Sequence, residues 1–114
     1  MNYKEERPWG WFEILFEEAG LKIKRIMVKP GKRLSLQSHE RRAENWVVTQ
    51  GQALFTLDDK TFSLGPRQGV YIPEKAKHRM ENQGKEDLVF IEVQTGTYLG
   101  EDDITRFQDD FERC

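Results

Sequence analysis

Short segments of β-forming residues follow one another along most of the chain, separated by turn residues at roughly eight- to twelve-residue intervals. This spacing is typical of a β-sandwich or barrel, and no long helical period interrupts it. The 114 residues suffice for one domain and are too few for two, so residues 1–114 are expected to form a single all-β unit. The expected strands are Trp11–Phe16, Lys22–Val28, Leu34–His39, Glu44–Thr49, Gln52–Leu57, Lys60–Leu64, Gly69–Ile72, His78–Asn82 and Leu88–Thr95.

The pattern changes after Gly100. Ile104, Phe107 and Phe111 are spaced by three and four residues, which is compatible with a short amphipathic helix. The same residues could belong to an extended strap whose aromatic side chains dock on the barrel. The period is too short to decide between a helix and a strap.

Charge and hydropathy exclude several classes of protein. Lys and Arg number 18 against 20 Asp and Glu, a net charge of −2, which lacks the basic excess of a nucleic-acid binder. The apolar runs are too short for a membrane helix, and the amino-terminal MNYKEERPW does not resemble a signal peptide. The single cysteine, Cys114, cannot form an internal disulfide. We therefore expect a cytoplasmic protein that binds neither nucleic acid nor membrane.

The chain has only two histidines, His39 and His78, each on or beside an expected strand. Gln37 and His39 are two residues apart on one strand, so both side chains point to the same face. Glu44 opens the next strand. Two imidazoles with carboxylate and amide oxygens form a mixed set suited to zinc or another first-row divalent ion. The alternative for each histidine is a hydrogen-bonded structural role.

Two motifs, Gly31-x7-His39-x4-Glu44-x6-Gly51 and Pro73-x4-His78-x3-Asn82, resemble the metal-binding motifs of the cupin superfamily. Longer stretches are similar to the carboxy-terminal domain of type II phosphomannose isomerases. These stretches are RPWGWFE (7–13), KRIMVKPGKRLSLQSH (24–39), RAENWVV (42–48), YIPEKAKHRMEN (71–82) and EVQTGTYLGEDDITRFQDDF (92–111). The resemblance implies a double-stranded β-helix, or jelly-roll, barrel. It also implies metal-dependent interconversion of mannose 6-phosphate and fructose 6-phosphate in nucleotide-sugar or polysaccharide synthesis.

The first motif departs from the family pattern QMHHHRAEHW, because Glu40, Arg41 and Asn45 replace three histidines. Position 41 is a metal ligand in many cupins, and arginine cannot coordinate a metal. The metal ligands of the other, zinc-dependent type of phosphomannose isomerase are nevertheless similar to a Gln-x-His, Glu, His set. Resemblance to that set predicts one divalent ion on Gln37, His39, Glu44 and His78, with zinc the first expectation and Mn, Co or Ni as alternatives. The competing interpretation is a lost or weakened site.

The isomerase chemistry that the resemblance implies needs cations for the phosphate and for transition-state charge. Arg79 and Arg42 are the candidates, supplemented by Arg41 and by Lys75, which stands where the family usually has glycine. Any one of these cations could instead be a solvated surface charge. Arg106 is a candidate to fold back onto the site, or alternatively to form a structural ion pair.

The same chemistry needs a base beside C2 of the sugar. Glu92 shares a strand face with Phe90 and Gln94, so a polar cavity could turn it inward, although a solvent-facing glutamate is the simpler interpretation. Glu81 is a second candidate for the base.

Two kinds of protein partner are expected besides the sugar phosphate. A homodimer is one, because cupin barrels have a sheet edge that needs cover and the amino-terminal segment is available to pair. The family domain usually follows a guanylyltransferase domain, for which this chain has no nucleotide-binding segment. The alternative function is therefore a non-catalytic, sugar-phosphate-binding or regulatory cupin that partners a separate guanylyltransferase.

Overall fold

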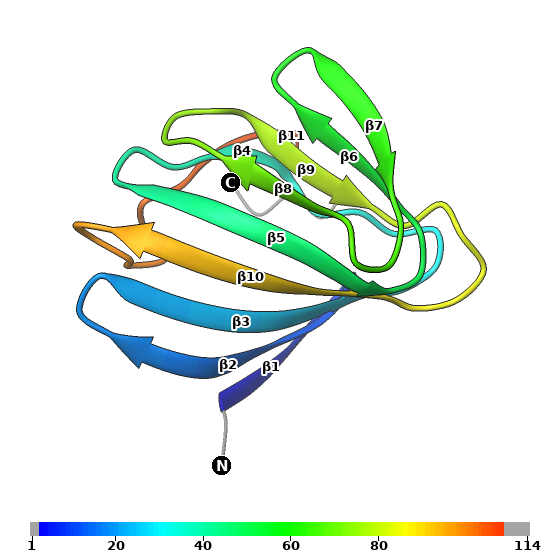
Figure 1. Cartoon of the computed structure of the whole chain (residues 1–114), viewed down its shortest axis with the longest axis horizontal. Coiled ribbons are helices and arrows are strands. Elements are labelled where there is room, and N and C mark those ends of the chain that lie inside the picture. Colours follow the sequence, from blue (N-terminus) through cyan, green and yellow to red (C-terminus); the bar gives the residue numbers. More distant parts are fainter. Residues whose placement is uncertain (1–2, 109–114) are drawn as a thin grey trace.

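The computed structural model describes residues 3–108, which form two antiparallel sheets facing each other across a shared core (Figure 1). One sheet has the order β1-β2-β3-β10-β5-β8 and the other β11-β4-β9-β6-β7. The strands are β1 (Tyr3–Arg7), β2 (Gly10–Glu18), β3 (Leu21–Val28), β4 (Leu36–Ser38), β5 (Arg42–Gln50), β6 (Ala53–Leu57), β7 (Lys60–Leu64), β8 (Gly69–Ile72), β9 (His78–Glu81), β10 (Leu88–Gly96) and β11 (Thr105–Gln108). The described residues contain no helix that could span a membrane.

All nine expected strands are present, and two further strands were not predicted. The charged segment Tyr3–Arg7 pairs with β2 as the edge strand β1, where Lys4 and Glu6 are exposed while Glu5 and Arg7 are half-buried. Residues Thr105–Gln108 pair with β4, so the strap was the right alternative for the tail and the helix was wrong over these residues. Phe111 lies outside the described residues. β1 is an edge strand of the six-stranded sheet, so a second copy of the chain could pair with it. The homodimer itself stays a prediction.

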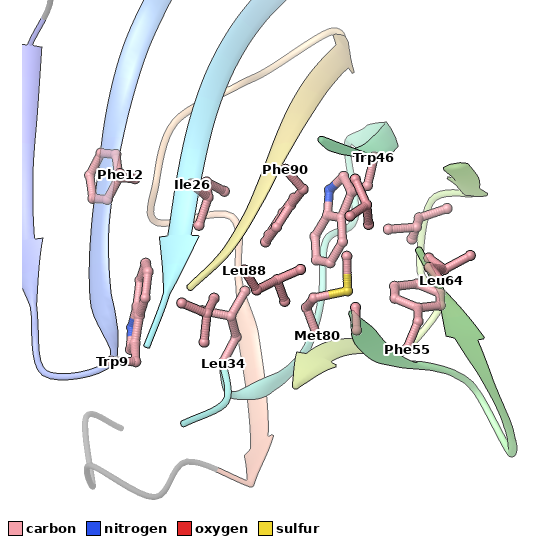
Figure 2. Packing of buried hydrophobic residues seen from close by; sticks show 14 of the residues in the cluster. Trp9, Phe12, Ile26, Leu34, Trp46, Phe55, Leu64, Met80, Leu88 and Phe90 are labelled. Atoms are coloured by element: carbon pink, nitrogen blue, oxygen red, sulfur yellow. The ribbon is translucent and has the colours of Figure 1, made fainter. Parts of the chain in front are cut away.

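The interior of the six-stranded sheet is apolar at one end and polar at the other. Along β3, β5 and β10, alternate residues point inward, and each strand changes from apolar to polar side chains at nearly the same level. The buried apolar members are Ile26, Val28, Trp46, Val48, Leu88 and Phe90, and the buried polar members are Lys22, Lys24, Arg42, Glu44, Glu92 and Gln94. The apolar end packs on Leu34, Phe55, Leu64 and Met80, as Figure 2 shows. A solid core thus supports one end of the barrel, and the polar groups gather at the other.

The turn before His78 contains a strained residue. Lys75 has a φ of 72°, in the left-handed region that favours glycine, and its backbone N–H donates to the His39 carbonyl at 2.7 Å. The hydrogen bond ties the turn that carries His78 to the residue that carries the other imidazole. The charged side chain therefore occupies a position whose backbone suits the glycine that the resemblance leads us to expect there.

Lys75→Gly is expected to raise the free energy of unfolding by about 0.5–1 kcal/mol, because relief of the strained φ outweighs the extra freedom of glycine in the unfolded chain. Urea unfolding of the metal-stripped protein measures the change. Glu74→Gly, one residue earlier in the same turn and outside the positive-φ region, is the control and should lose stability. Loss of stability in both variants would show that the left-handed conformation carries no strain at Lys75.

Candidate metal centre

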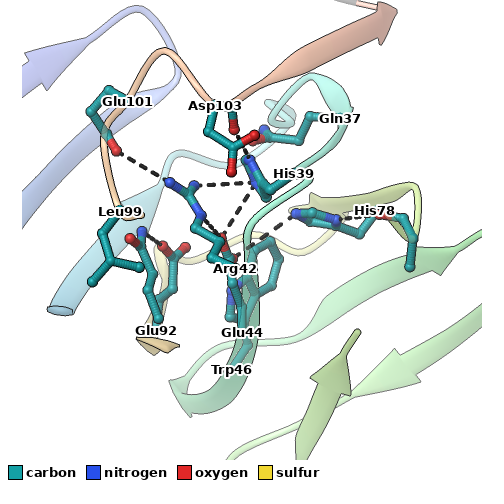
Figure 3. Close-up of polar contacts among 12 residues, drawn as sticks. Gln37, His39, Arg42, Glu44, Trp46, His78, Glu92, Leu99, Glu101 and Asp103 are labelled. Carbon is teal, nitrogen blue, oxygen red and sulfur yellow. Dashed lines mark hydrogen bonds and ion pairs between the residues drawn. The ribbon is translucent and has the colours of Figure 1, made fainter. Parts of the chain in front are cut away.

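Three predicted ligands converge at the polar end of the barrel. His39 directly follows β4, Glu44 lies on β5 and His78 begins β9. One coordinating atom from each lies within 4.8 Å of the others, and the three side chains are 1–3% exposed (Figure 3). Residues from both sheets therefore meet at one buried point, which only the folded barrel brings together.

Backbone carbonyls select the tautomer of both histidines. His39 Nδ1 lies 2.7 Å from the Asp103 carbonyl oxygen, and His78 Nδ1 lies 3.0 Å from that of Ala76. A carbonyl can only accept, so each Nδ1 carries the proton and donates it. Each Nε2 then carries the ring's lone pair, the form in which histidine binds a metal.

Glu44 is held in place by two donors. Trp46 Nε1 donates to Oε1 and Arg42 Nε donates to Oε2, both at 2.7 Å. These bonds aim the carboxylate at the imidazoles: Oε2 lies 3.3 Å from His39 Nε2, and Oε1 lies 4.0 Å from His78 Nε2. Lone pairs therefore face lone pairs, an arrangement that a cation would stabilise.

His78 Nε2 is a further sign that the cluster suits a cation. Within residues 3–108 this buried nitrogen has no hydrogen-bond partner. Arg42 reaches the other imidazole, with a terminal guanidinium nitrogen 3.2 Å from His39 Nε2. An unsatisfied buried acceptor facing a carboxylate is the geometry expected where a metal ligand lacks its ion. The donor set thus fits a divalent metal.

The environment of His39 keeps its ring neutral. Burial and the nearby Arg42 charge lower its pKa to about 4, although the Asp103 carbonyl favours the protonated form. The ring is therefore neutral at physiological pH, as metal coordination requires.

Gln37, the fourth predicted ligand, lies opposite His78 in the β4–β9 ladder. Its amide nitrogen donates to Ser35 Oγ at 3.0 Å, which leaves the amide oxygen as its coordinating atom. Gln37 lines the cavity that Glu44 also lines, but its role as a ligand stays a prediction.

A cavity of about 310 Å³ opens beside the cluster and contains Glu92 in its wall. Glu92 is 5% exposed, so the solvent-facing interpretation was wrong and the inward-facing one is confirmed. Gln94 Nε2 donates to its Oε2. Burial and the neighbouring Glu44 carboxylate raise the pKa of Glu92, against the opposing effect of Lys24 and Arg42.

Of the predicted cations, Arg42 and Arg106 line this cavity, whereas Arg79, Arg41 and Lys75 do not. Arg79, a candidate for phosphate or transition-state charge, is 5% exposed rather than a solvated surface charge, and it donates to the Leu34 carbonyl at 2.9 Å and to Gln108 at 3.1 Å. It thereby fastens the strap strand β11 to the barrel.

Arg41 and Lys75 are exposed. The Arg41 guanidinium lies over the Tyr98 ring, 5.3 Å from its centroid. The substrate-binding roles predicted for both residues stay untested.

The sequence did not single out the residues that close the site. The Asp103 carboxylate accepts the backbone N–H groups of Glu40 and Arg41, both at 2.9 Å, while its carbonyl accepts from His39. Glu101 reaches Lys24 at the mouth of the cavity. The segment between β10 and β11 therefore fixes the loop that carries His39.

Comparison with known proteins identifies the family to which this chain belongs. Residues 1–109 match the family described as "Mannose-6-phosphate isomerase C-terminal". Alginate biosynthesis protein AlgA of Pseudomonas aeruginosa is 51% identical over 94% of this chain and 22% of its own length. Mannose-1-phosphate guanylyltransferase ManC of Salmonella typhimurium is 44% identical over 99% of this chain and 24% of its own. The chain thus spans about a quarter or less of the length of these curated relatives.

Solved structures show the same barrel. Oxalate decarboxylase from Bacillus subtilis superimposes with a TM-score of 0.83 over 93% of this chain and 30% of its own, at 18% identity. Similarity at that identity establishes the fold alone, a double-stranded β-helix. With the family match over nearly the whole length, it shows that this chain belongs to the mannose-6-phosphate isomerase C-terminal family of cupin domains.

Proposed function

We propose that this chain is a stand-alone, metal-dependent isomerase that interconverts mannose 6-phosphate and fructose 6-phosphate for polysaccharide synthesis. The observation that carries the proposal is the convergence of His39 Nε2, His78 Nε2 and Glu44 on one buried point beside a cavity that also contains Glu92. Family membership and the relative named for alginate biosynthesis support the choice of substrate and pathway class.

His39, Glu44 and His78 would hold the metal, with Gln37 as fourth ligand and zinc as the first ion to test. A divalent ion bound there would polarise the oxygens on C1 and C2 of the open-chain sugar. The chain's own residues must then orient the sugar and move a proton between the two carbons.

Glu92 is the residue best placed to move that proton. It lies on the cavity wall, its raised pKa makes its carboxylate a stronger base, and Gln94 fixes the orientation of its carboxyl group. We infer that the Glu92 carboxylate takes the proton from C2 of the aldose to leave an enediolate and that the same carboxyl group returns it to C1, while the proton of the C2 hydroxyl passes to the C1 oxygen. Arg42 and Arg106 provide positive charge on the same cavity.

A coupled assay tests the proposal. The metal-stripped protein is incubated with mannose 6-phosphate, and fructose 6-phosphate is measured before and after addition of Zn²⁺, Mn²⁺, Co²⁺ or Ni²⁺. Turnover is expected only with metal. The side chains of the cluster donate electron pairs, so a bound metal ion must supply the Lewis acid. Equal rates with and without metal would contradict the metal-dependent mechanism.

One observation favours the alternative, a sugar-phosphate-binding or regulatory cupin that partners a guanylyltransferase. Arg41 stands where many cupins have a second histidine ligand, and its side chain lies on Tyr98 rather than at the cluster. The relatives with guanylyltransferase names are longer proteins, which makes such a partner reasonable. Sugar-phosphate binding without turnover under every metal would select this alternative.

A further inference from the structure

We propose that Lys22, Lys24 and Arg42 form an anion site for a phosphate monoester, and that the chain's own Glu101 carboxylate occupies this site until the ligand displaces it. The inference deepens the proposed function and rests on it for the identity of the ligand. The contacts that support it are all between charged side chains of this chain.

Three cations are buried close to one another at the polar end of the barrel. Lys22 and Lys24 are each 5% exposed and Arg42 is 6% exposed. Burying a cation without an opposite charge is strongly unfavourable, so each needs an anion nearby. Two buried carboxylates lie near these cations: Glu44 is already bound to Arg42 and Trp46, and Glu92, which lies opposite Lys24 in the ladder, accepts from Gln94.

The remaining counter-charge comes from the mouth of the site. Glu101 Oε1 accepts from Lys24 at 2.8 Å, while Oε2 lies 3.5 Å from Arg42 and 3.9 Å from Lys22. One carboxylate thus contacts all three cations, although its side chain is 58% exposed. These cations hold the pKa of Glu101 below its ordinary value, although partial desolvation of the carboxylate acts in the opposite direction.

The fit of Glu101 is incomplete in a way that suits phosphate. A carboxylate has two oxygens for three cations, so Oε2 is shared between Arg42 and Lys22 at long distances. A terminal phosphate has three oxygens and carries a charge between about −1.5 and −2, so it offers each cation its own acceptor. Phosphate would therefore neutralise the cluster better than Glu101 does.

The location also suits a sugar phosphate. Lys24, Arg42 and Glu101 line the cavity that contains Glu92, and Arg42 bridges Glu101 to Glu44 and His39. Glu101 lies between β10 and β11, outside both strands, so its side chain can leave without breaking a ladder. An anion in place of the Glu101 carboxylate would contact Arg42, which also contacts the candidate metal ligands Glu44 and His39.

Calorimetric titration with inorganic phosphate, with fructose 6-phosphate and with fructose tests the site at constant ionic strength. Glu101→Gln is expected to tighten binding of both phosphates by about five- to tenfold, because the competing carboxylate is gone. Lys24→Met should weaken both by at least about tenfold, while Lys24→Arg should retain binding. Fructose should bind no more tightly to Glu101→Gln than to the wild type.

Glu17→Gln is the matched control. Glu17 lies 3.5 Å from Lys22 and its removal changes the net charge by the same amount, but it contacts neither Lys24 nor Arg42. Phosphate affinity should change less than about twofold in this variant, because exposed single ion pairs contribute little. A melting curve for each variant confirms folding, and Glu101→Gln alone decides the matter if Lys24→Met does not fold.

Equal phosphate affinity in wild type, Glu101→Gln and Glu17→Gln would overturn the inference, as would an equal gain in both glutamine variants. Isomerase turnover with no effect of Glu101→Gln on phosphate binding would reject the anion site and leave the proposed function standing. Tighter phosphate binding in Glu101→Gln without turnover would support the anion site and reject the proposed isomerase function.

Discussion

The His78→Phe variant should lose at least about 100-fold in zinc affinity while the barrel stays folded. His78 Nε2 is a buried nitrogen with no hydrogen-bond partner in the described part of the chain, so its removal tests the proposed role as a metal ligand. The ring also packs edge-on against Trp46, with centroids 5.3 Å apart. Phenylalanine keeps that aromatic contact and removes the ligand, which separates metal binding from packing.

Zinc titration and elemental analysis measure the loss, with about one ion per chain expected in the wild type. Melting in the presence of a chelator reports the stability of the barrel itself. Glu81→Gln is the control, since Glu81 ends the same strand and is not part of the His39–Glu44–His78 cluster. Undiminished zinc binding in His78→Phe would place the metal elsewhere or exclude it.

Glu92→Gln should lower kcat by about 10²- to 10⁴-fold, the usual contribution of a general acid–base group, without reducing the bound metal. Its raised pKa means that folding favours the protonated form, so this carboxyl group makes the fold less stable as pH rises above the ordinary range of glutamate. The neutral amide removes that penalty at pH 7. The melting temperature should therefore be unchanged or higher while activity falls.

Opposite changes in activity and stability distinguish a proton-transfer role from a structural one. Steady-state kinetics with mannose 6-phosphate, metal content and melting curves are compared among wild type, Glu92→Gln and Glu81→Gln. Glu81 was the second candidate for the base and does not line the cavity, so its variant should behave like wild type. Full activity in Glu92→Gln would mean that another group moves the proton.

The sequence predicted those features that depend on neighbouring residues. Nine strands followed from local alternation and turn residues, and His39, Glu44 and His78 followed from their places on the expected strands and from the resemblance to cupin motifs. The direction of the Glu92 face could not be decided within β10, because alternation defines two faces and not which one is buried. Only pairing with β3 and β5 places that residue among inward-facing side chains.

Contacts between distant segments account for what was missed. Lys24 and Glu101 are 77 residues apart, and His39 and Asp103 are 64 apart. Lys22 and Lys24 alternate with Ile23 as an ordinary half-exposed strand would, so they gave no sign of burial. The structural role of Arg79 was missed because it bonds to Gln108 in β11, a segment for which the sequence left a helix and a strap open.

The two-ended interior of the barrel has an evolutionary consequence. Mutations at the apolar end act on the survival of the folded protein, whereas mutations at the polar end act on what it binds, so the two sets of positions can be selected almost independently. A barrel of this kind can change its ligand through substitutions at the polar end while the apolar core stays the same.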